Sequence, residues 1–151
     1  MRFLVFVKAT PESEQGIFPD DGGKMFEEMN AFNEQLVKAG IMLAAEGLQP
    51  SSKGMRLKFE GEKRTVTDGP FAETKELIAG FWMLQAKSRE EVLEWMKRAP
   101  FDGGTEIEIR PVYESDDFGD ALPESVRVAR SEEHTSELQS LAYIVCRLLL
   151  E

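Results

Sequence analysis

The fold of this chain is decided by the stretch Leu77-Ile78-Ala79-Gly80-Phe81-Trp82-Met83-Leu84-Gln85-Ala86-Lys87, which predicts one long β-strand. In Ile78–Leu84 both alternating sets of positions are apolar, and the same holds for Leu4–Val7 within a predicted strand at residues 2–8. Strands with apolar side chains on both faces lie inside a sheet. Residues 105–112 also alternate, but only one of their two sides is apolar. We therefore expect the strands at residues 2–8 and 77–87 to be central in the sheet and the strand at residues 105–112 to be an edge strand.

Periodicity places the remaining elements around these strands. A helix is expected at about residues 24–39, where Ala39-Gly40 supplies a C-terminal stop, and another strand at residues 41–46. A clean alternation predicts a short hairpin with strands at residues 55–60 and 63–67. The capping box Ser88-Arg89-Glu90-Glu91 opens a second helix. The residues expected to face inward from the two helices are Met25, Phe26, Met29, Phe32, Leu36, Val92, Leu93 and Met96.

With the hairpin set aside as an insertion, the order of elements is β-α-β-β-α-β. This order predicts an α+β fold with a ferredoxin-like antiparallel sheet. Two helices can cover only one face of such a sheet, and the other apolar face would exceed the exposed patch that monomers usually tolerate. We therefore expect a homodimer packed sheet to sheet, a dimeric α+β barrel, with a pocket at or near the dimer interface.

Composition argues against several functions. The net charge is -10, from 18 basic and 28 acidic side chains, and no stripe of Lys and Arg is present, so no nucleic-acid partner is expected. No segment approaches the roughly 18 apolar residues of a membrane span. The apolar run at residues 3–7 is too short for a signal peptide. We expect a soluble, cytoplasmic protein with no membrane partner.

The C-terminal residues 130–151 are interpreted separately. Arg130–Ser140 and Val145–Leu150 resemble the conceptual translation of a common sequencing adapter, which predicts that this tail is not native. The alternative is a genuine amphipathic helix, because apolar residues recur at helical spacing in Leu138, Leu141, Val145 and Leu148. The expected organisation is one domain at residues 1–114, an acidic, loosely held surface extension at 115–129 and the tail at 130–151.

The tail contains the only histidine, His134, and the only cysteine, Cys146. Residues 1–129 therefore have no thiol nucleophile, no cysteine zinc site and no imidazole for acid/base chemistry. Absence of disulfides fits a reducing compartment. Any catalysis has to use carboxylates, lysine, arginine, tyrosine or a bound metal, and we expect no cofactor and no metal.

The segment Val66–Glu76, which contains Asp68-Gly69-Pro70-Phe71, resembles the signature of the YCII-related proteins of the DGPF type. The resemblance extends to Glu46–Pro50 and Gly80–Trp82 and loosely covers residues 1 to about 114. It implies the ferredoxin-like fold, and kinship with dimeric α+β barrels that isomerise, oxygenate or dehalogenate small rings. In better characterised relatives the acid/base pair is His with Asp, which residues 1–129 do not match. Proteins of the DGPF type are often associated with extracytoplasmic-function sigma factors, so a regulatory partner is implied by analogy.

Two carboxylates are the candidate catalytic groups. Asp68 ends a predicted strand beside apolar Phe71 and Trp82, where it could serve as a general base or metal ligand. The alternative is that its side chain caps the amides of the Gly-Pro turn. Glu46 follows a strand and precedes Gly47, so it either enters the barrel as an acid or only marks the exit of the strand into solvent.

Five further residues are candidates for substrate binding. Lys75 could neutralise an anionic substrate or pair with Glu73, and Trp82 is either a core residue or part of the pocket lining. The full set is Arg64, Phe71, Glu73, Lys75 and Trp82.

Three classes of function follow from these residues. The first is a small-molecule-binding protein, the second a small-molecule enzyme of lyase, isomerase or dehalogenase type that uses carboxylates, and the third a regulatory accessory or structural dimer. An enzyme predicts Asp68 and Glu46 in one enclosed cavity. A binding protein predicts a cavity whose polar groups are already paired with one another.

Overall fold

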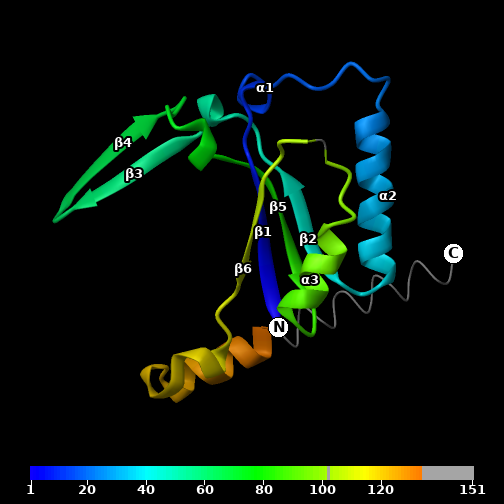
Figure 1. Cartoon of the computed structure of the whole chain (residues 1–151). Coiled ribbons are helices and arrows are strands. Elements are labelled where there is room, and N and C mark those ends of the chain that lie inside the picture. Colours follow the sequence, from blue (N-terminus) through cyan, green and yellow to red (C-terminus); the bar gives the residue numbers. More distant parts are fainter. Residues whose placement is uncertain (102, 134–151) are drawn as a thin grey trace, which may run out of the picture. The chain divides into compact units, whose positions relative to one another are not determined.

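The computed structural model describes residues 1–101 and 103–133 (Figure 1). The chain divides into two compact units, Met1–Val112 and the residues from Tyr113 onward, and each is described here by itself.

The first unit contains a four-stranded antiparallel sheet in the order β2-β5-β1-β6. Its strands are β1 (Arg2–Lys8), β2 (Met42–Gly47), β5 (Ile78–Gln85) and β6 (Ile107–Pro111). The two strands that are apolar on both faces, β1 and β5, are central, and β6 is an edge, as predicted. With the helices between them, the strands follow the order β-α-β-β-α-β expected of a ferredoxin-like α+β fold.

Two helices connect the strands of this sheet. The first, α2 (Lys24–Lys38), ends where Gly40 takes a φ of 71°, a left-handed conformation that favours glycine. The second, α3 (Arg89–Met96), begins at Ser88, whose Oγ accepts a hydrogen bond from Glu91 N at 3.2 Å. The bounds of α2 and the start of α3 agree with the sequence signals to within two residues.

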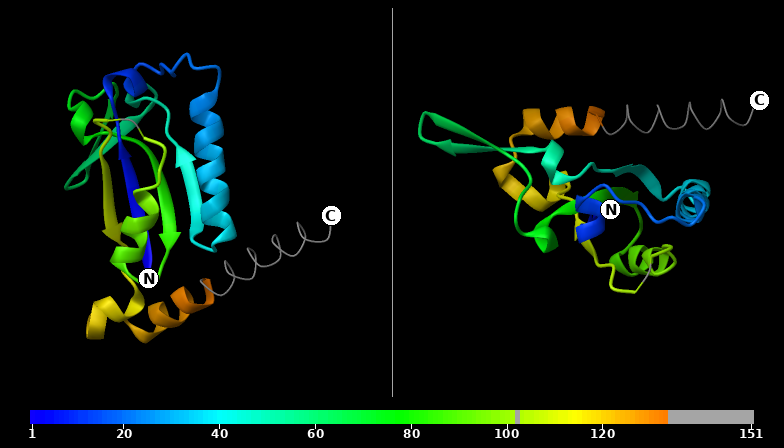
Figure 2. Two further views of the ribbon diagram at one scale, coloured as in Figure 1. Left: turned by 45° about the vertical axis from the view of Figure 1, so that its right-hand side comes forward. Right: turned by 90° about the horizontal axis from the view of Figure 1, so that it is seen from above.

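The core lies between the sheet and the two helices (Figure 2). Each large side chain buried there contributes about 1.5–3 kcal/mol relative to exposure. Trp82 is central to it, because its ring meets Phe32 and Phe101 edge-on at centroid distances of 6.1 and 5.9 Å. Its indole N–H donates to Asn33 Oδ1 at 2.8 Å, which satisfies the buried polar atom. The most deeply buried side chains are Phe3, Leu36, Leu84, Val5 and Val92.

Two residues expected to face inward do not. Leu93 is 45% exposed and Phe26 is 55% exposed. A helix turns by about 100° per residue, so Leu93 lies about 100° around the helix from buried Val92 and about 60° from buried Met96, on the solvent side of both. Phe26 lies about 120° around the helix from buried Phe32. Phe26 packs instead against Phe18, with ring centroids 5.4 Å apart.

The other face of the sheet carries the second set of alternating side chains. The strand register places Leu4 opposite Met83 and Phe6 opposite Phe81. On this face β6 contributes Glu108 and Arg110, and β2 contributes Glu46 opposite Phe81. Since α2 and α3 pack on the opposite face, we call this surface the open sheet face.

The predicted hairpin forms a second, two-stranded sheet. Its strands are β3 (Met55–Glu60) and β4 (Lys63–Asp68), and all the residues of both strands are exposed. Figure 1 shows the hairpin extending away from the main sheet.

The second unit is helical where the structure describes it. Residues Ser115–Ala121 form the 3-10 helix η3, and residues 124–133 are helical. The rings of Tyr113 and Phe118 are 5.0 Å apart, and Arg127 pairs with Asp116 at 3.7 Å and Glu124 at 3.6 Å. Much of the acidic extension therefore has helical structure. The larger part of the interpreted tail, with His134 and Cys146, lies outside the described residues.

Among the residues that the structure describes, no helix is long and apolar enough to cross a membrane.

Candidate functional site

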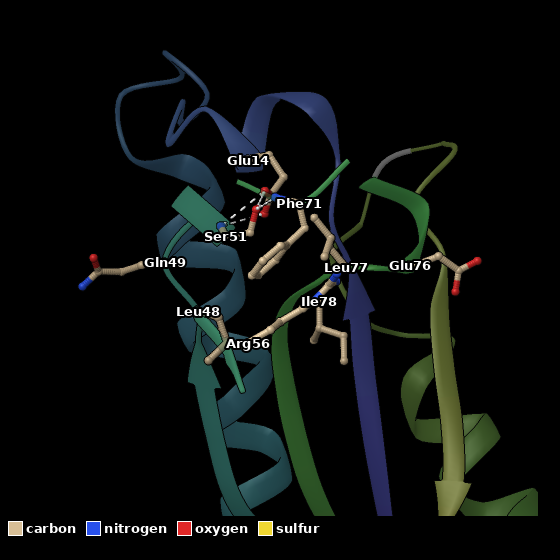
Figure 3. A pocket seen from close by; sticks show the side chains of 9 residues that line it. All are labelled: Glu14, Leu48, Gln49, Ser51, Arg56, Phe71, Glu76, Leu77 and Ile78. Atoms are coloured by element: carbon tan, nitrogen blue, oxygen red, sulfur yellow. Dashed lines mark hydrogen bonds between the residues drawn. The ribbon is translucent and has the colours of Figure 1, made fainter. Parts of the chain in front are cut away.

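A pocket of about 250 Å³ opens where several loops of the first unit meet at one end of the main sheet (Figure 3). It is surrounded by the helix α1 (Pro11–Glu14), the 3-10 helices η1 (Ser51–Lys53) and η2 (Thr74–Glu76) and the first residues of β3. Its lining residues are Glu14, Leu48, Gln49, Ser51, Arg56, Phe71, Glu76, Leu77 and Ile78.

Glu14 and Ser51 form the polar centre of this pocket. The Glu14 carboxylate accepts hydrogen bonds from Ser51 N, at 3.2 and 3.3 Å to its two oxygens, and from Ser51 Oγ. Ser51 Oγ in turn accepts from Phe71 N at 3.1 Å. A carboxylate, a hydroxyl and a backbone amide are therefore already paired with one another.

Glu14 reaches this position because a short helix begins at Thr10. The Thr10 hydroxyl accepts from Ser13 N at 3.2 Å, and Ser13 Oγ accepts from Thr10 N at 2.9 Å. Pro11 occupies the first helical position, where its missing N–H costs nothing. The resulting turn presents Glu14 to Ser51.

Gly69 lies in the loop that carries Phe71 and holds this loop close to η1. Its N–H donates to Gly54 O at 3.0 Å. A Cβ at this position would lie 1.8 Å from Ser51 O, so the backbone can approach only because glycine has no side chain. The peptide bond from Gly69 to Pro70 is cis.

Arg56 stacks on Phe71. Its Cζ lies 3.7 Å from the centroid of the ring, within the range of a cation–π interaction. Within residues 1–101 and 103–133, Arg56 makes no ion pair with a carboxylate. The guanidinium is therefore held in place while its N–H donors are not committed to an acidic side chain.

Leu48, Leu77 and Ile78 form the apolar wall. Leu77 is 9% exposed, and Leu48 is held at the end of β2 by a hydrogen bond from its N–H to Ala79 O at 2.8 Å. The side chains of Gln49 and Glu76 point away from the centre of the pocket (Figure 3).

Of the residues predicted from sequence, Phe71 lines the pocket. Asp68 is the exposed last residue of β4, opposite Met55, and Glu46 is exposed on the open sheet face opposite Phe81. Neither carboxylate lines the pocket. Trp82 lies in the core, 4% exposed, because its position in β5 faces the helices.

The remaining predicted residues lie on the hairpin and around η2. Arg64 donates to Gly61 O at 2.7 Å and Lys63 O at 2.9 Å, and its Cζ lies 4.5 Å from the ring centroid of Phe59. Glu73 and Lys75 are exposed and make no ion pair with each other in the described part of the chain.

Sequence reasoning missed Glu14, Ser51 and Arg56. The run Thr10-Pro11-Glu12-Ser13 carries a helix-start signal that could have located α1 between the first strand and the helix expected at about residues 24–39. No local pattern marks Ser51, whose role comes from a contact with a residue 37 positions away.

The described residues contain no group of three or more His, Cys, Asp or Glu side chains that could hold a metal ion. The pocket therefore combines Arg56 stacked on Phe71, the hydrogen-bonded pair Glu14 and Ser51, and an apolar wall.

Residues 1–116 match the YCII-related domain, and the chain belongs to this family. A curated relative is the uncharacterized protein R00369 of Rhizobium meliloti (strain 1021), which is 28% identical over 78 residues. That match spans 52% of this chain and 63% of the relative, less than two thirds of its length.

A solved structure that resembles the chain is 5-chloro-2-hydroxyhydroquinone dehydrochlorinase (TftG) from Burkholderia phenoliruptrix AC1100, in complex with 2,5-dihydroxybenzoquinone. It is 18% identical, the match covers 77% of this chain and 98% of that chain, and the TM-score is 0.38.

Proposed function

We propose that this protein binds a small organic anion in the pocket and that Arg56 is the residue that recognises it. The observation that carries the proposal is the guanidinium of Arg56, stacked 3.7 Å from the Phe71 ring centroid and unpaired with any carboxylate of the described chain. A guanidinium presents several N–H donors in a planar fork that matches a carboxylate. Stacking on Phe71 holds the guanidinium in one orientation before the ligand binds, which lowers the entropy cost of binding.

The apolar part of the ligand would lie against Leu48, Leu77 and Ile78. Small-molecule sites of this kind combine an apolar wall with a few placed polar groups. A pocket of about 250 Å³ is small for such a site, which favours a single ring or a short chain over a larger molecule.

The polar groups beside Arg56 favour binding over catalysis. The Glu14 carboxylate is already occupied by the N–H and the hydroxyl of Ser51. Asp68 and Glu46, the two carboxylates suggested by sequence for acid/base chemistry, lie outside the pocket lining. The run Asp68-Gly69-Pro70-Phe71, on which the resemblance to the DGPF type rests, contributes Phe71 to the pocket and attaches the loop to Ser51.

A thermal-shift screen of the full chain tests this function. The compounds are benzoate, hydroxybenzoates, short aliphatic acids, phenols, benzamide, benzylamine and divalent metals, each with wild type, Arg56→Gln and Lys58→Gln. Lys58 is the matched control, because it lies on the same side of β3, carries the same charge, pairs with Glu60 at 2.7 Å and does not line the pocket. We expect carboxylates to raise the melting temperature of wild type and Lys58→Gln but not of Arg56→Gln. A screen without any hit would contradict the proposal.

We further propose that a second copy covers the open sheet face. Leu4, Phe6, Phe81 and Met83 supply the apolar surface, and neither α2 nor α3 packs on it. Light scattering should show a particle heavier than one chain. The mass should fall for Phe81→Glu and remain unchanged for Val37→Glu, a 50% exposed position on α2. A single-chain mass for wild type at high concentration would exclude this dimer.

A further inference from the structure

The hairpin β3–β4 presents an apolar face that no other part of the first unit covers. Met55 is 69% exposed, Leu57 50%, Phe59 66% and Val66 59%. Side chains alternate along a strand, and the register pairs these residues on one side of the hairpin. We call this side the hairpin face; its residues are Met55, Leu57, Phe59, Arg64, Val66 and Asp68.

Such a surface needs a partner. A two-stranded hairpin is at best marginally stable alone in water, and it gains its stability from packing its apolar face. Four large, exposed apolar side chains on one small sheet also exceed the scattered apolar residues normal for a protein surface.

The hairpin face is arranged symmetrically about its centre. Leu57 pairs with Val66 in the middle, Phe59 with Arg64 toward the tip, and Met55 with Asp68 toward the base. One end therefore carries a cation and an apolar side chain, and the other end carries an anion and an apolar side chain. Arg64 and Asp68 are separated by about 13 Å of strand, so both lie beyond the apolar centre.

A pattern of this kind is complementary to itself. When two copies of one surface meet face to face around a two-fold axis that lies in the interface and runs across the strands, each end of the surface meets the opposite end of the other copy. An axis through the Leu57–Val66 pair brings Phe59 onto Met55 of the partner subunit and Arg64 onto Asp68 of the partner subunit.

We propose that the hairpin face docks on the hairpin face of a second copy around such an axis, with Arg64 and Asp68 forming two ion pairs across the interface. The side chain of Asp68 makes no hydrogen bond or ion pair within the described part of the chain, so its carboxylate is free to accept one. Arg64 uses one nitrogen for the carbonyls of Gly61 and Lys63, which leaves other N–H donors for a carboxylate.

This interface is distinct from the pocket and from the open sheet face. Arg56 lies on the opposite side of β3, where it contacts Phe71. Docking through the hairpin face therefore leaves the pocket side of the hairpin accessible.

Cross-linking of the full chain tests the geometry. In a Cys146→Ser background, Val66→Cys places a thiol near the axis, and Thr65→Cys places one on the other side of the same strand. A short bis-maleimide should link two Val66→Cys chains, with several-fold less product from Thr65→Cys. The Val66→Cys product should persist when Phe81→Glu is added, which separates this interface from the open sheet face. Equal yields from the two thiols, or no product from either, would overturn the proposal.

Charge exchange tests the ion pairs in the same Val66→Cys protein. Arg64→Asp or Asp68→Arg alone places like charges across the interface, and each should weaken self-association about tenfold, as expected for the loss of two exposed ion pairs. The double variant Arg64→Asp/Asp68→Arg reverses both charges and should restore the yield. Circular dichroism confirms that each variant is folded. A folded double variant that cross-links no better than the single variants would refute the pairing.

Discussion

The Arg56 Cζ atom lies 3.7 Å from the centroid of the Phe71 ring, which joins the first strand of the hairpin to the loop that follows its second strand. Phe71 is itself held through its N–H by Ser51, and Ser51 by Glu14. Four segments of the chain are thus fixed around one small pocket, and the position of the arginine depends on all of them.

Ser51→Ala should destabilise the protein. The substitution removes the hydroxyl that donates to Glu14 and accepts from Phe71 N, and it leaves partly buried partners without their bonds. The expected loss is about 1–2 kcal/mol in the free energy of unfolding, measured by urea denaturation. Ser52→Ala is the control, because Ser52 is the exposed neighbour in the same 3-10 helix. Equal effects of the two substitutions would show that the Ser51 hydroxyl is not structural.

Gly69→Ala should disturb the same region through its backbone. The new Cβ would lie 1.8 Å from Ser51 O, so the loop carrying Phe71 has to move away from η1. We expect a loss of more than about 1 kcal/mol in unfolding free energy together with weakened ligand binding. Gly47→Ala, where a Cβ meets nothing within 4 Å, should have a much smaller effect. Full stability in Gly69→Ala would contradict the close approach of the two segments.

Leu84→Ala should cost about 2–5 kcal/mol of unfolding free energy, because Leu84 is fully buried and the cavity left behind cannot be filled by its neighbours. Leu93→Ala, the same change at a 45% exposed position, should cost less than about 1 kcal/mol. Denaturant unfolding measures both. A Leu93→Ala variant as unstable as Leu84→Ala would mean that α3 is rotated from the position described.

The order of the central and edge strands could be predicted from sequence, because a strand that is buried on both faces has apolar residues at successive positions. The double apolar pattern of Ile78–Leu84 and Leu4–Val7 placed β5 and β1 at the centre, and the one-sided pattern of residues 105–112 placed β6 at the edge. Which side chains of a helix reach the core depends on its rotation and on where the sheet ends. For this reason Leu93 and Phe26 were assigned to the wrong side.

The pocket was less predictable, because its residues meet only after folding. Phe71 was identified through its loop, but Glu14 and Ser51 are 37 positions apart and neither has a local signature of function. The prominent carboxylates Asp68 and Glu46 drew attention because charge near a strand end is visible in sequence. The structure places them outside the pocket lining, at the end of the hairpin and on the open sheet face.

The free energy of unfolding should depend on the ionisation of Glu108 at acidic pH. A hydrogen bond from Arg110 at 2.6 Å holds the pKa of the Glu108 carboxyl below its ordinary value of 4.5; desolvation opposes this, and the charges of Arg110 and Lys8 assist. A lowered pKa in the folded state means that the ionised form stabilises the fold above the unfolded pKa. This stabilisation is lost as the pH falls through the lowered value.

Carbon-13 NMR of the side-chain carboxyl should therefore show Glu108 titrating on the acid side of 4.5. Arg110→Gln should raise the pKa of Glu108 by more than Lys8→Gln does, because Lys8 lies farther away at 3.5 Å and contributes less. A larger rise from Lys8→Gln would contradict this order of causes.

The central claim is that Arg56 selects an anion in the pocket, and methyl NMR of the full chain titrated with benzoate tests it most directly. We predict saturable shifts at Leu48, Leu77 and Ile78, with Leu4 and Met83 on the open sheet face unchanged. Loss of a charge-assisted hydrogen bond in Arg56→Gln should weaken binding roughly tenfold to a hundredfold, whereas Lys58→Gln should bind as wild type does. Equal shifts with benzamide, or unaltered benzoate binding by Arg56→Gln, would contradict the claim.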